Sequence, residues 1–335
     1  MRTPPLILVV EDNSASLEII KTRLLANHYT VITATDGMEG LRQAREHLPD
    51  LILLDIMMPK MNGLEVCRHL KSDESLPFIP IILVTAKSDP KDVVAGLEAG
   101  GDEYLTKPVD HRSLVARVKS MLRIKELHDM VLEQSNQMTR QLKTATKVQS
   151  LFWPKIPDLP DHQNIWTFSE PASYVGGDLH DIIALSDNSL LAYVADISGK
   201  GVAAALIMAA LSAMIRAEAA LHNNIITLLK VVNESMYNLC SDEGYFSTII
   251  CSRYWPQSGR LQLVRAGHPN PLWIVDGEIS ELPWLEGVPL GIMEEVSYES
   301  CEITLSSGDS CLLYSDGVIE AENESLEMFG NNNLN

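Results

Sequence analysis

The chain has 335 residues, with 26 lysines and arginines against 45 aspartates and glutamates, so its formal net charge is −19. This length predicts about two domains, and the acidic balance disfavours binding to nucleic acid or to an anionic membrane surface. The five cysteines show no CxxC spacing and are expected to be reduced thiols in a cytoplasmic protein. The apolar run at the N-terminus is too short for a signal peptide, and the longest apolar run, residues 202–215, is too short for a membrane span.

Residues 1–122 alternate short apolar runs with helical patterns, which predicts five βα units and a doubly wound, five-stranded parallel sheet, an α/β fold. The predicted strands are residues 6–10, 30–34, 51–55, 81–85 and 104–106. The predicted helices are residues 14–26, 36–47, 62–72, 90–99 and a last one from about residue 110. Ligands of such a sheet bind beyond the carboxyl ends of its strands.

Polar side chains follow the predicted strands at that edge, namely Glu11, Asp12, Asp55, Thr85 and Lys107. Carboxylates from neighbouring strand ends can hold Mg²⁺, and a lysine and a hydroxyl can contact a phosphoryl group. Strand-end polar residues that merely face water would explain each of them singly. Together they favour a phosphoryl-transfer site, because each position carries the residue type that this chemistry requires.

The segments VVEDN, LLDIMMPKMNG, ILVTA and YLTKP stand in this region in that order. With them, residues 5–122 closely resemble the response-regulator receiver domain. The roles that the resemblance implies are a phosphoacceptor for a sensor histidine kinase, Asp55; Mg²⁺ ligands, Glu11, Asp12 and Asp55; phosphate contacts, Thr85 and Lys107; and a switch aromatic, Tyr104. It also implies a cis peptide bond between Lys107 and Pro108, an isomer open mainly to bonds before proline.

Residues 123–153 form a connector with a repeating apolar pattern. Apolar residues fall at positions 124, 127, 131, 138, 145, 148 and 152, and Gln134 and Gln141 complete steps of three and four. This heptad seam predicts a parallel two-stranded coiled coil and therefore a homodimer. The alternative is a single amphipathic helix that lies on its own domain. Pro154, Pro157 and Pro160 are expected to end the helix.

Residues 154–335 change to a pattern of hairpins and helices. Strands are predicted at residues 174–185, 189–197, 246–255, 260–266, 271–276 and 309–315, and helices from 202 to about 221 and at 224–240. The order of these elements predicts an α+β domain in which a β-sandwich is flanked by helices.

Three acidic motifs stand out in this second domain: GGD at Asp178, ADISGKG at Asp196 and SDG at Asp316. Each carboxylate has glycine nearby, as expected where side chains and backbone converge on a hard cation. A single motif of this kind is more often a turn, but three in one domain favour a metal centre. Two Mg²⁺ or Mn²⁺ ions held by shared carboxylates could activate water and clamp a phosphoryl group for in-line attack.

The segments PASYVGGDLHDI, YVADISGKGVAAAL, FSTIICSRY, LVRAGHPNPLWI, VPLGI and LLYSDGVIEA extend this pattern. With them, residues 147–330 resemble the SpoIIE-type branch of the metal-dependent (PPM) protein phosphatases, which implies an α-β-β-α sandwich. The resemblance implies that Asp196 bridges two metals, that Asp178 and the Ile197 carbonyl bind one of them, and that Asp316 binds the other. The implied substrate is phosphoserine or phosphothreonine on a protein, typically an anti-sigma-factor antagonist.

Two departures from the family pattern bear on these expectations. The family closes with an Asp-Asp-hydroxyl strand that the residues up to Asn335 do not contain, so we expect a C-terminally incomplete domain in which one metal lacks a carboxylate. His180 stands where an aromatic residue is common, either as a tolerated substitution or as a third ligand. We expect His268 to be a hydrogen-bonded structural histidine, and Ser198 has no positioned base that would make it a nucleophile.

Three functions are compatible with these motifs. The first is a response regulator in which phosphorylation of Asp55 controls a metal-dependent serine/threonine phosphatase. The second is a degenerate phosphatase fold that acts as a phosphorylation-gated adaptor for a sigma-factor regulator. The third, a cyclic dinucleotide synthase suggested by GGDLH, is disfavoured because its signature matches over three residues only.

Overall fold

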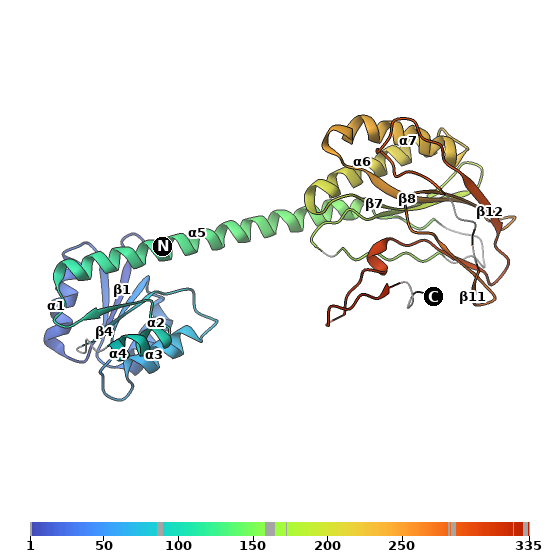
Figure 1. The fold of residues 1–335 in the computed structure, drawn as a ribbon. Helices are drawn as coiled ribbons and strands as arrows, with labels where there is room; N and C mark the ends of the chain where they lie inside the picture. The colour runs from blue at the N-terminus through green and yellow to red at the C-terminus, as the bar shows by residue number, and fades with distance from the viewer. Residues whose placement is uncertain are drawn as a thin grey trace. The chain divides into compact units, whose positions relative to one another are not determined.

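The computed structural model describes residues 2–85, 90–157, 165–171, 173–280, 282, 286–323, 325–330 and 334 (Figure 1). The chain divides into two compact units, Met1–Met138 and Thr139–Asn335, each with cores of its own. The boundary falls inside α5 (His111–Gln149), a continuous helix of 39 residues. The predicted last helix of the first domain and the predicted connector are therefore one helix, followed by a 3-10 turn at Ser150–Phe152, ahead of Pro154. Pro160 lies outside the described residues.

The first unit is built on a parallel sheet with the strand order β2-β1-β3-β4-β5, which confirms the predicted fold. Its strands are β1 (Leu6–Val10), β2 (Thr30–Ala34), β3 (Leu51–Asp55), β4 (Ile81–Thr85) and β5 (Glu103–Thr106). Its other helices are α1 (Ser14–Leu25), α2 (Gly37–His47), α3 (Gly63–Lys71) and α4 (Pro90–Glu98). Strands β1, β3 and β4 are buried along their whole length, as expected when helices cover both faces of a parallel sheet.

Alternate strand residues serve two separate cores, because successive side chains of a strand point to opposite faces. Ile7 and Val9 pack with residues of α1 and α5. Leu8 and Val10 pack with residues of α2 and α3. At the carboxyl end of β3, α3 begins so close to the strand that a Cβ on Gly63 would lie 2.1 Å from the Asp55 carbonyl oxygen. Glycine at this position therefore lets the helix start directly behind the acidic edge of the sheet.

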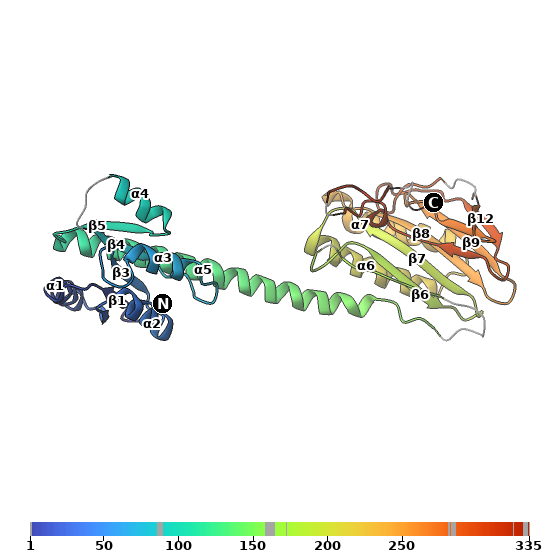
Figure 2. The same cartoon turned by 90° about the horizontal axis from the view of Figure 1, so that it is seen from below.

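The second unit contains a five-stranded antiparallel sheet with the order β12-β9-β8-β7-β6 (Figure 2) and a three-stranded sheet with the order β11-β10-β13. The strands of the first sheet are β6 (Leu179–Ala184), β7 (Leu190–Ile197), β8 (Ser247–Trp255), β9 (Arg260–Ala266) and β12 (Ser300–Thr304). Those of the second are β10 (Leu272–Val275), β11 (Glu278–Ser280) and β13 (Ser310–Leu312). Leu261 and Leu263 pack with Cys311 and Leu313, so the two sheets share a core.

Helices α6 (Gly201–Ala219) and α7 (Ile225–Cys240) cover one face of the larger sheet (Figure 1). Ala204, Met208, Leu211 and Ile215 form the buried stripe of α6, at the spacing of one helix face. Among the described residues, α6 is the one helix long and apolar enough to cross a membrane by length and composition, and this stripe belongs to the core. The other helices with printed bounds in this unit are short 3-10 turns, and the described residues Gly330 and Leu334 are also helical. The antiparallel sheets with helices against them agree with the predicted α+β fold.

The strands of the second unit differ from the prediction mainly at their ends. Strand β6 begins at Leu179 rather than at residue 174, because Gly176 and Gly177 leave the ladder and turn toward other partners. Strand β13 is shorter than predicted, and β11 and β12 were not predicted. The residues of β11 and β12 are half-buried or exposed and do not form the apolar run that indicates a strand.

Candidate functional site

The first candidate site lies at the carboxyl ends of β1 and β3. Glu11 and Asp55 are only 1% and 3% exposed, whereas Asp12 is exposed. One carboxylate oxygen from each of the three lies within 4.8 Å of the other two. Hard oxygen ligands at this spacing suit Mg²⁺, so the predicted set Glu11, Asp12 and Asp55 does converge.

Lys107 supplies the positive charge in this site. Its Nζ donates to Glu11 Oε1 at 2.9 Å and to Asp55 Oδ2 at 2.8 Å. Burial raises the pKa of Glu11, the hydrogen bond from Lys107 lowers it, the Asp55 charge raises it again, and the net shift is upward. Burial acts to lower the pKa of Lys107, but the hydrogen bonds to Asp55 and Glu11 outweigh it and the pKa is raised. The lysine thus holds two buried carboxylates that would otherwise repel each other.

Thr85 and Tyr104 lie on β4 and β5, the two strands that follow β3 in the sheet. Thr85 is buried at the end of β4, and its carbonyl accepts a hydrogen bond from the Lys107 backbone N–H at 2.7 Å. Tyr104 is half-buried on β5 with the Arg117 guanidinium 5.4 Å from its ring centre. The bond between Lys107 and Pro108 is cis, as the resemblance implied. The Met57 backbone N–H, which the sequence did not single out, donates to Asp55 Oδ1 at 3.3 Å.

The second candidate site gathers the three predicted carboxylates of the second unit. Asp196 is the penultimate residue of β7, Asp178 directly precedes β6, and Asp316 begins a 3-10 turn beyond β13. Ser315 Oγ donates to Asp178 Oδ2 at 3.1 Å, so the Asp316 segment contacts the Asp178 segment directly. The sequence analysis quoted Ser315 within the SDG motif but gave it no role.

The electrostatics of Asp196 show how close these carboxylates lie. Burial, repulsion by Asp178, a side-chain hydrogen bond with Asp178 and repulsion by Asp316 raise the pKa of Asp196 to about 7. The raised pKa of Asp196 is what burial and neighbouring carboxylates produce when they are crowded into one site. A divalent cation would relieve this repulsion, and carboxylate oxygens are the ligands it prefers, so this donor set fits a metal site.

Gly177 leaves room beside Asp196. A Cβ there would lie 3.0 Å from the Ile197 carbonyl oxygen and 3.3 Å from Asp196 Oδ1. It would therefore crowd two of the oxygens that the family resemblance assigns to metals. The nearby Gly199 has φ +95°, a conformation that favours glycine, where the chain leaves β7 to start α6.

The three carboxylates are not drawn together as tightly as those of the first site. Among the described residues, the one group of three or more metal-ligating side chains with atoms within 4.8 Å of one another is that of Glu11, Asp12 and Asp55. The structure brings Asp178 and Asp196 into contact and places Asp316 near enough to repel Asp196. The roles of all three as metal ligands, and that of the Ile197 carbonyl, stay predictions.

Two further candidate residues, Ser198 and His268, have structural partners. Ser198 Oγ accepts a hydrogen bond from the Phe246 backbone N–H at 3.0 Å, which uses the hydroxyl to join β7 to β8. His268 is 2% exposed, and its Nδ1 lies 2.8 Å from Thr248 Oγ1. Burial lowers the pKa of His268 to about 4, so it is neutral at physiological pH. Burial also lowers the pKa of His180, against the opposing charges of Asp181 and Asp178.

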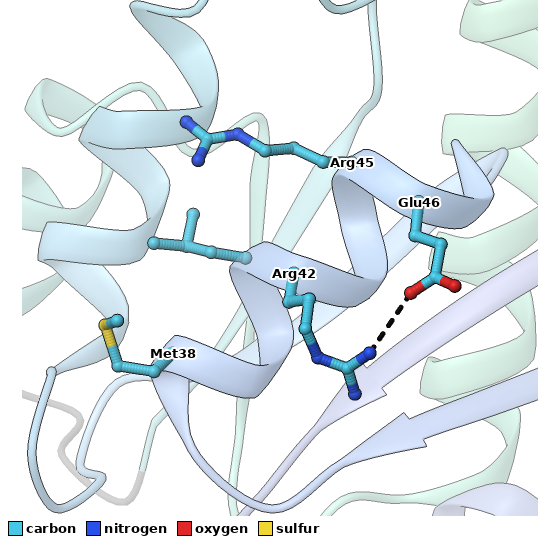
Figure 3. A pocket seen from close by; sticks show the side chains of 5 residues that line it. Met38, Arg42, Arg45 and Glu46 are labelled. Carbon is cyan, nitrogen blue, oxygen red and sulfur yellow. Dashed lines mark hydrogen bonds and ion pairs between the residues drawn. The ribbon is translucent and has the colours of Figure 1, made fainter.

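A shallow hollow on α2 contains none of the predicted site residues (Figure 3). It is lined by Met38, Leu41, Arg42, Arg45 and Glu46. Arg42 pairs with Glu46 at 3.1 Å, and Arg45 pairs with Asp73 at 2.9 Å. Because its charged groups already have partners, the hollow offers no group poised for chemistry.

Comparisons with known proteins agree with this division. Residues 7–119 match the family model of the response regulator receiver domain, and residues 186–335 match that of stage II sporulation protein E (SpoIIE). Response regulator PleD of Caulobacter vibrioides is 46% identical over 123 residues, which are 37% of this chain and 27% of PleD. Response regulator ArlR of Staphylococcus aureus is 43% identical over 125 residues, 37% of this chain and 56% of ArlR. The chain thus spans less than two thirds of the length of either relative.

A solved structure of a putative response regulator from Chloroflexus aurantiacus is 33% identical and covers 36% of this chain and 98% of its own, with a TM-score of 0.35. Each family match contains residues of one candidate site. The first match includes Glu11, Asp55 and Lys107, and the second includes Asp196 and Asp316. Residues 7–119 are therefore a response regulator receiver domain, and residues 186–335 are a domain of the SpoIIE phosphatase family.

Proposed function

We propose that this protein is a response regulator whose phosphorylation on Asp55 by a sensor histidine kinase controls a metal-dependent protein serine/threonine phosphatase. Its proposed substrate is a phosphorylated anti-sigma-factor antagonist, and its proposed location is the cytoplasm. The observation that carries the proposal is the convergence of Asp178 and Asp196, beside a glycine, Gly177, that leaves room at Asp196 Oδ1 and the Ile197 carbonyl oxygen. The acidic site of the receiver domain, with Lys107 across it, supports the regulatory part.

In the phosphatase domain, Asp178, Asp196, Asp316 and the Ile197 carbonyl would hold two Mn²⁺ or Mg²⁺ ions, with Asp196 as the shared ligand. Bound there, the ions would supply an activated water and neutralise the charge of the phosphoryl group. The protein's own contribution is positional. Ser315 holds Asp178 through a hydrogen bond of 3.1 Å. The Ser247 hydroxyl donates to the Asp196 carbonyl at 3.1 Å, so the backbone of Asp196 is fixed at the end of β7.

In the receiver domain, Asp55 would accept the phosphoryl group with Glu11, Asp12 and Asp55 around Mg²⁺. Lys107 is already bonded to Asp55 and would turn to the new phosphoryl oxygens, which carry more charge than the carboxylate. Thr85 and Tyr104 lie on β4 and β5, the strands through which such a change would reach the outer face of the domain.

The proposed dimer uses α5. Ile124, Leu127, Val131, Met138 and Val148 are 44–63% exposed and fall on the predicted heptad seam. On another side of the helix, Lys125 is 6% exposed and His128 stacks on Phe78 of the receiver domain with ring centres 4.5 Å apart. These five side chains of the seam are exposed, which supports pairing with the same seam of a second copy. Phe152, at the end of the predicted seam, instead packs against the core of the second unit.

The regulatory claim is tested by phosphate release from a serine-phosphorylated antagonist protein in Mn²⁺, with and without beryllium fluoride as the phosphoryl mimic on Asp55. We expect the mimic to change the rate in the wild type and to have no effect in Asp55→Asn. Equal wild-type rates would refute the gating.

The adaptor function predicts a different result. In that case the partner would bind in a phosphorylation-dependent manner, no phosphate would be released, and Asp196→Ala would bind the partner as the wild type does.

A further inference from the structure

The end of α5 contacts the loop that carries Asp178. Gln149 is the last residue of the helix and is 8% exposed. Its side-chain Nε2 donates to the Gly176 carbonyl at 2.7 Å, and its Oε1 accepts from the Gly176 backbone N–H at 3.2 Å. One turn earlier, the Thr146 hydroxyl donates to the Tyr174 carbonyl at 2.5 Å. Two side chains of α5 thus hold the backbone of the segment just before Asp178.

The pair of bonds from Gln149 satisfies both backbone groups of Gly176. A loop residue outside a sheet ladder would otherwise take these bonds from water or leave them unmade. Two parallel bonds from one planar amide fix the orientation of the peptide as well as its distance. Because the amide is buried, the contact is not a solvent-exposed one that opens freely.

The two residues that follow Gly176 connect it to the carboxylates of Asp178 and Asp196. The next residue, Gly177, packs against the Ile197 carbonyl and Asp196 Oδ1 so closely that a Cβ would crowd both. The residue after it, Asp178, accepts a hydrogen bond from the Ser315 hydroxyl at 3.1 Å. A displacement of Gly176 therefore changes the position of Asp178 relative to Asp196.

We infer that the Gln149 side chain is a positioning group for the phosphatase site, which holds the Gly176–Asp178 loop so that Asp178 and Asp196 present their oxygens to one metal ion. The metal in this inference rests on the proposed function, whereas the contact between Gln149 and Gly176 does not. We call this pair of hydrogen bonds the clamp. Because α5 begins in the receiver domain and ends at Gln149, the clamp is also where regulation would act.

The test compares full-length Gln149→Leu with the wild type and with Gln137→Leu, a glutamine of the same helix that is exposed and lies off the heptad seam. In the metal-free protein, we expect the Gly176 amide to exchange with deuterium at least tenfold faster in Gln149→Leu, and not in Gln137→Leu. Mn²⁺ affinity is measured by titration calorimetry, and the binding of Asp178→Asn is subtracted to remove the contribution of the receiver's own site. The affinity of Gln149→Leu should be about tenfold lower than that of the wild type, as is usual when a residue that supports a metal ligand is removed.

Activity gives a further readout that general destabilisation would not reproduce. The kcat for phosphate release should fall in Gln149→Leu while the KM for the phosphoprotein stays unchanged. If Gln149→Leu does not fold, Thr146→Val serves in its place and should give a smaller change in the same direction. It removes the bond to Tyr174 together with the helix-internal bond to the Leu142 carbonyl, so Thr144→Val, which removes only the corresponding helix-internal bond to Arg140, is its control. Unchanged amide exchange and unchanged Mn²⁺ affinity in these variants would overturn the inference.

The two claims fail separately. A wild type that binds no more Mn²⁺ than Asp178→Asn would refute the proposed phosphatase centre, while faster exchange in Gln149→Leu would still establish the clamp. Conversely, a wild type with full metal binding and activity that Gln149→Leu retains would refute the clamp alone.

Discussion

Replacing Lys107 by methionine should destabilise the receiver domain. The lysine Nζ lies 2.8 Å from Glu11 Oε2 and 2.8 Å from Asp55 Oδ2, and these two side chains are 1% and 3% exposed. At an effective dielectric constant of about 20, unit charges about 3 Å apart attract by roughly 5 kcal/mol, and the cost of burying the ammonium cancels part of this. Removing one partner of a buried pair usually costs about 3–5 kcal/mol. The Lys107 side chain is 23% exposed, which favours the lower end, about 3 kcal/mol.

A loss of about 3 kcal/mol corresponds to a decrease of roughly 10 °C in the Tm of a domain of this size. The assay is differential scanning calorimetry in EDTA at pH 7.5, with Lys21→Met as the matched control. Lys21 pairs with Glu18 at 3.0 Å, but both side chains are exposed, so its replacement should leave the Tm almost unchanged.

The pH dependence gives a second check on the same reasoning. The pKa of Glu11 in the folded protein is raised above 4.5, and without the Lys107 hydrogen bond it rises further. Between pH 4.5 and the raised pKa of Glu11, the folded state therefore binds more protons than the unfolded state. The stability of the folded state falls as pH rises through that range. We expect the gap between variant and wild type to narrow below pH 4.5. Mg²⁺ should restore more stability to the variant than to the wild type, because it replaces the missing positive charge. A variant as stable as the wild type at pH 7.5 would refute the role of Lys107.

Three further predictions concern the SpoIIE-family domain and α5. Gly177→Ala should weaken Mn²⁺ binding about tenfold by crowding the ligand oxygens, whereas Gly176→Ala, whose Cβ would meet its nearest neighbour at 3.4 Å, should bind nearly as the wild type in calorimetric titrations. The pKa of Asp196 is about 7 in the folded protein, against an ordinary value of 3.8. The free energy of unfolding of the metal-free protein should therefore fall as pH rises from 4 to 7. In urea unfolding, Asp196→Asn should show a smaller change of this free energy with pH, and should be more stable than the wild type at pH 8. Val131→Asp should convert the dimer to a monomer in sedimentation experiments, while Leu132→Asp, also exposed but off the seam, should remain dimeric.

The sequence indicated the receiver domain almost completely, because its strands are continuous apolar runs that end at polar residues. Asp55 and Lys107 lie far apart in the sequence, yet both follow strands of one parallel sheet, and the carboxyl ends of such strands share an edge. The same reasoning is weaker in the second domain. Antiparallel strands place their carboxyl ends at opposite edges, so the approach of Asp178 to Asp196 follows from the β6–β7 pairing and from the glycines that precede β6.

The residues that the sequence analysis missed make their contacts through tertiary packing. Gln149 ends a helix whose heptad pattern gives it no special role, and its partner Gly176 is 27 positions away. Ser315 bonds to Asp178 across 137 positions. Neither contact follows a repeat or a strand register, so no local pattern predicts it. The short strands β11 and β12 were missed for a related reason, because they are stabilised by pairing rather than by burial of an apolar run.

The central claim is that Asp178, Asp196 and Asp316 form the metal centre of a protein phosphatase. The most direct test is the single-turnover release of phosphate from a serine-phosphorylated antagonist protein by the wild type and by Asp196→Asn, each in Mn²⁺ and in EDTA. The account predicts release by the wild type only in Mn²⁺, and a rate at least about 100-fold lower in Asp196→Asn, since the bridging ligand is lost. Release that persists in EDTA, or that is equally fast in Asp196→Asn, would contradict it.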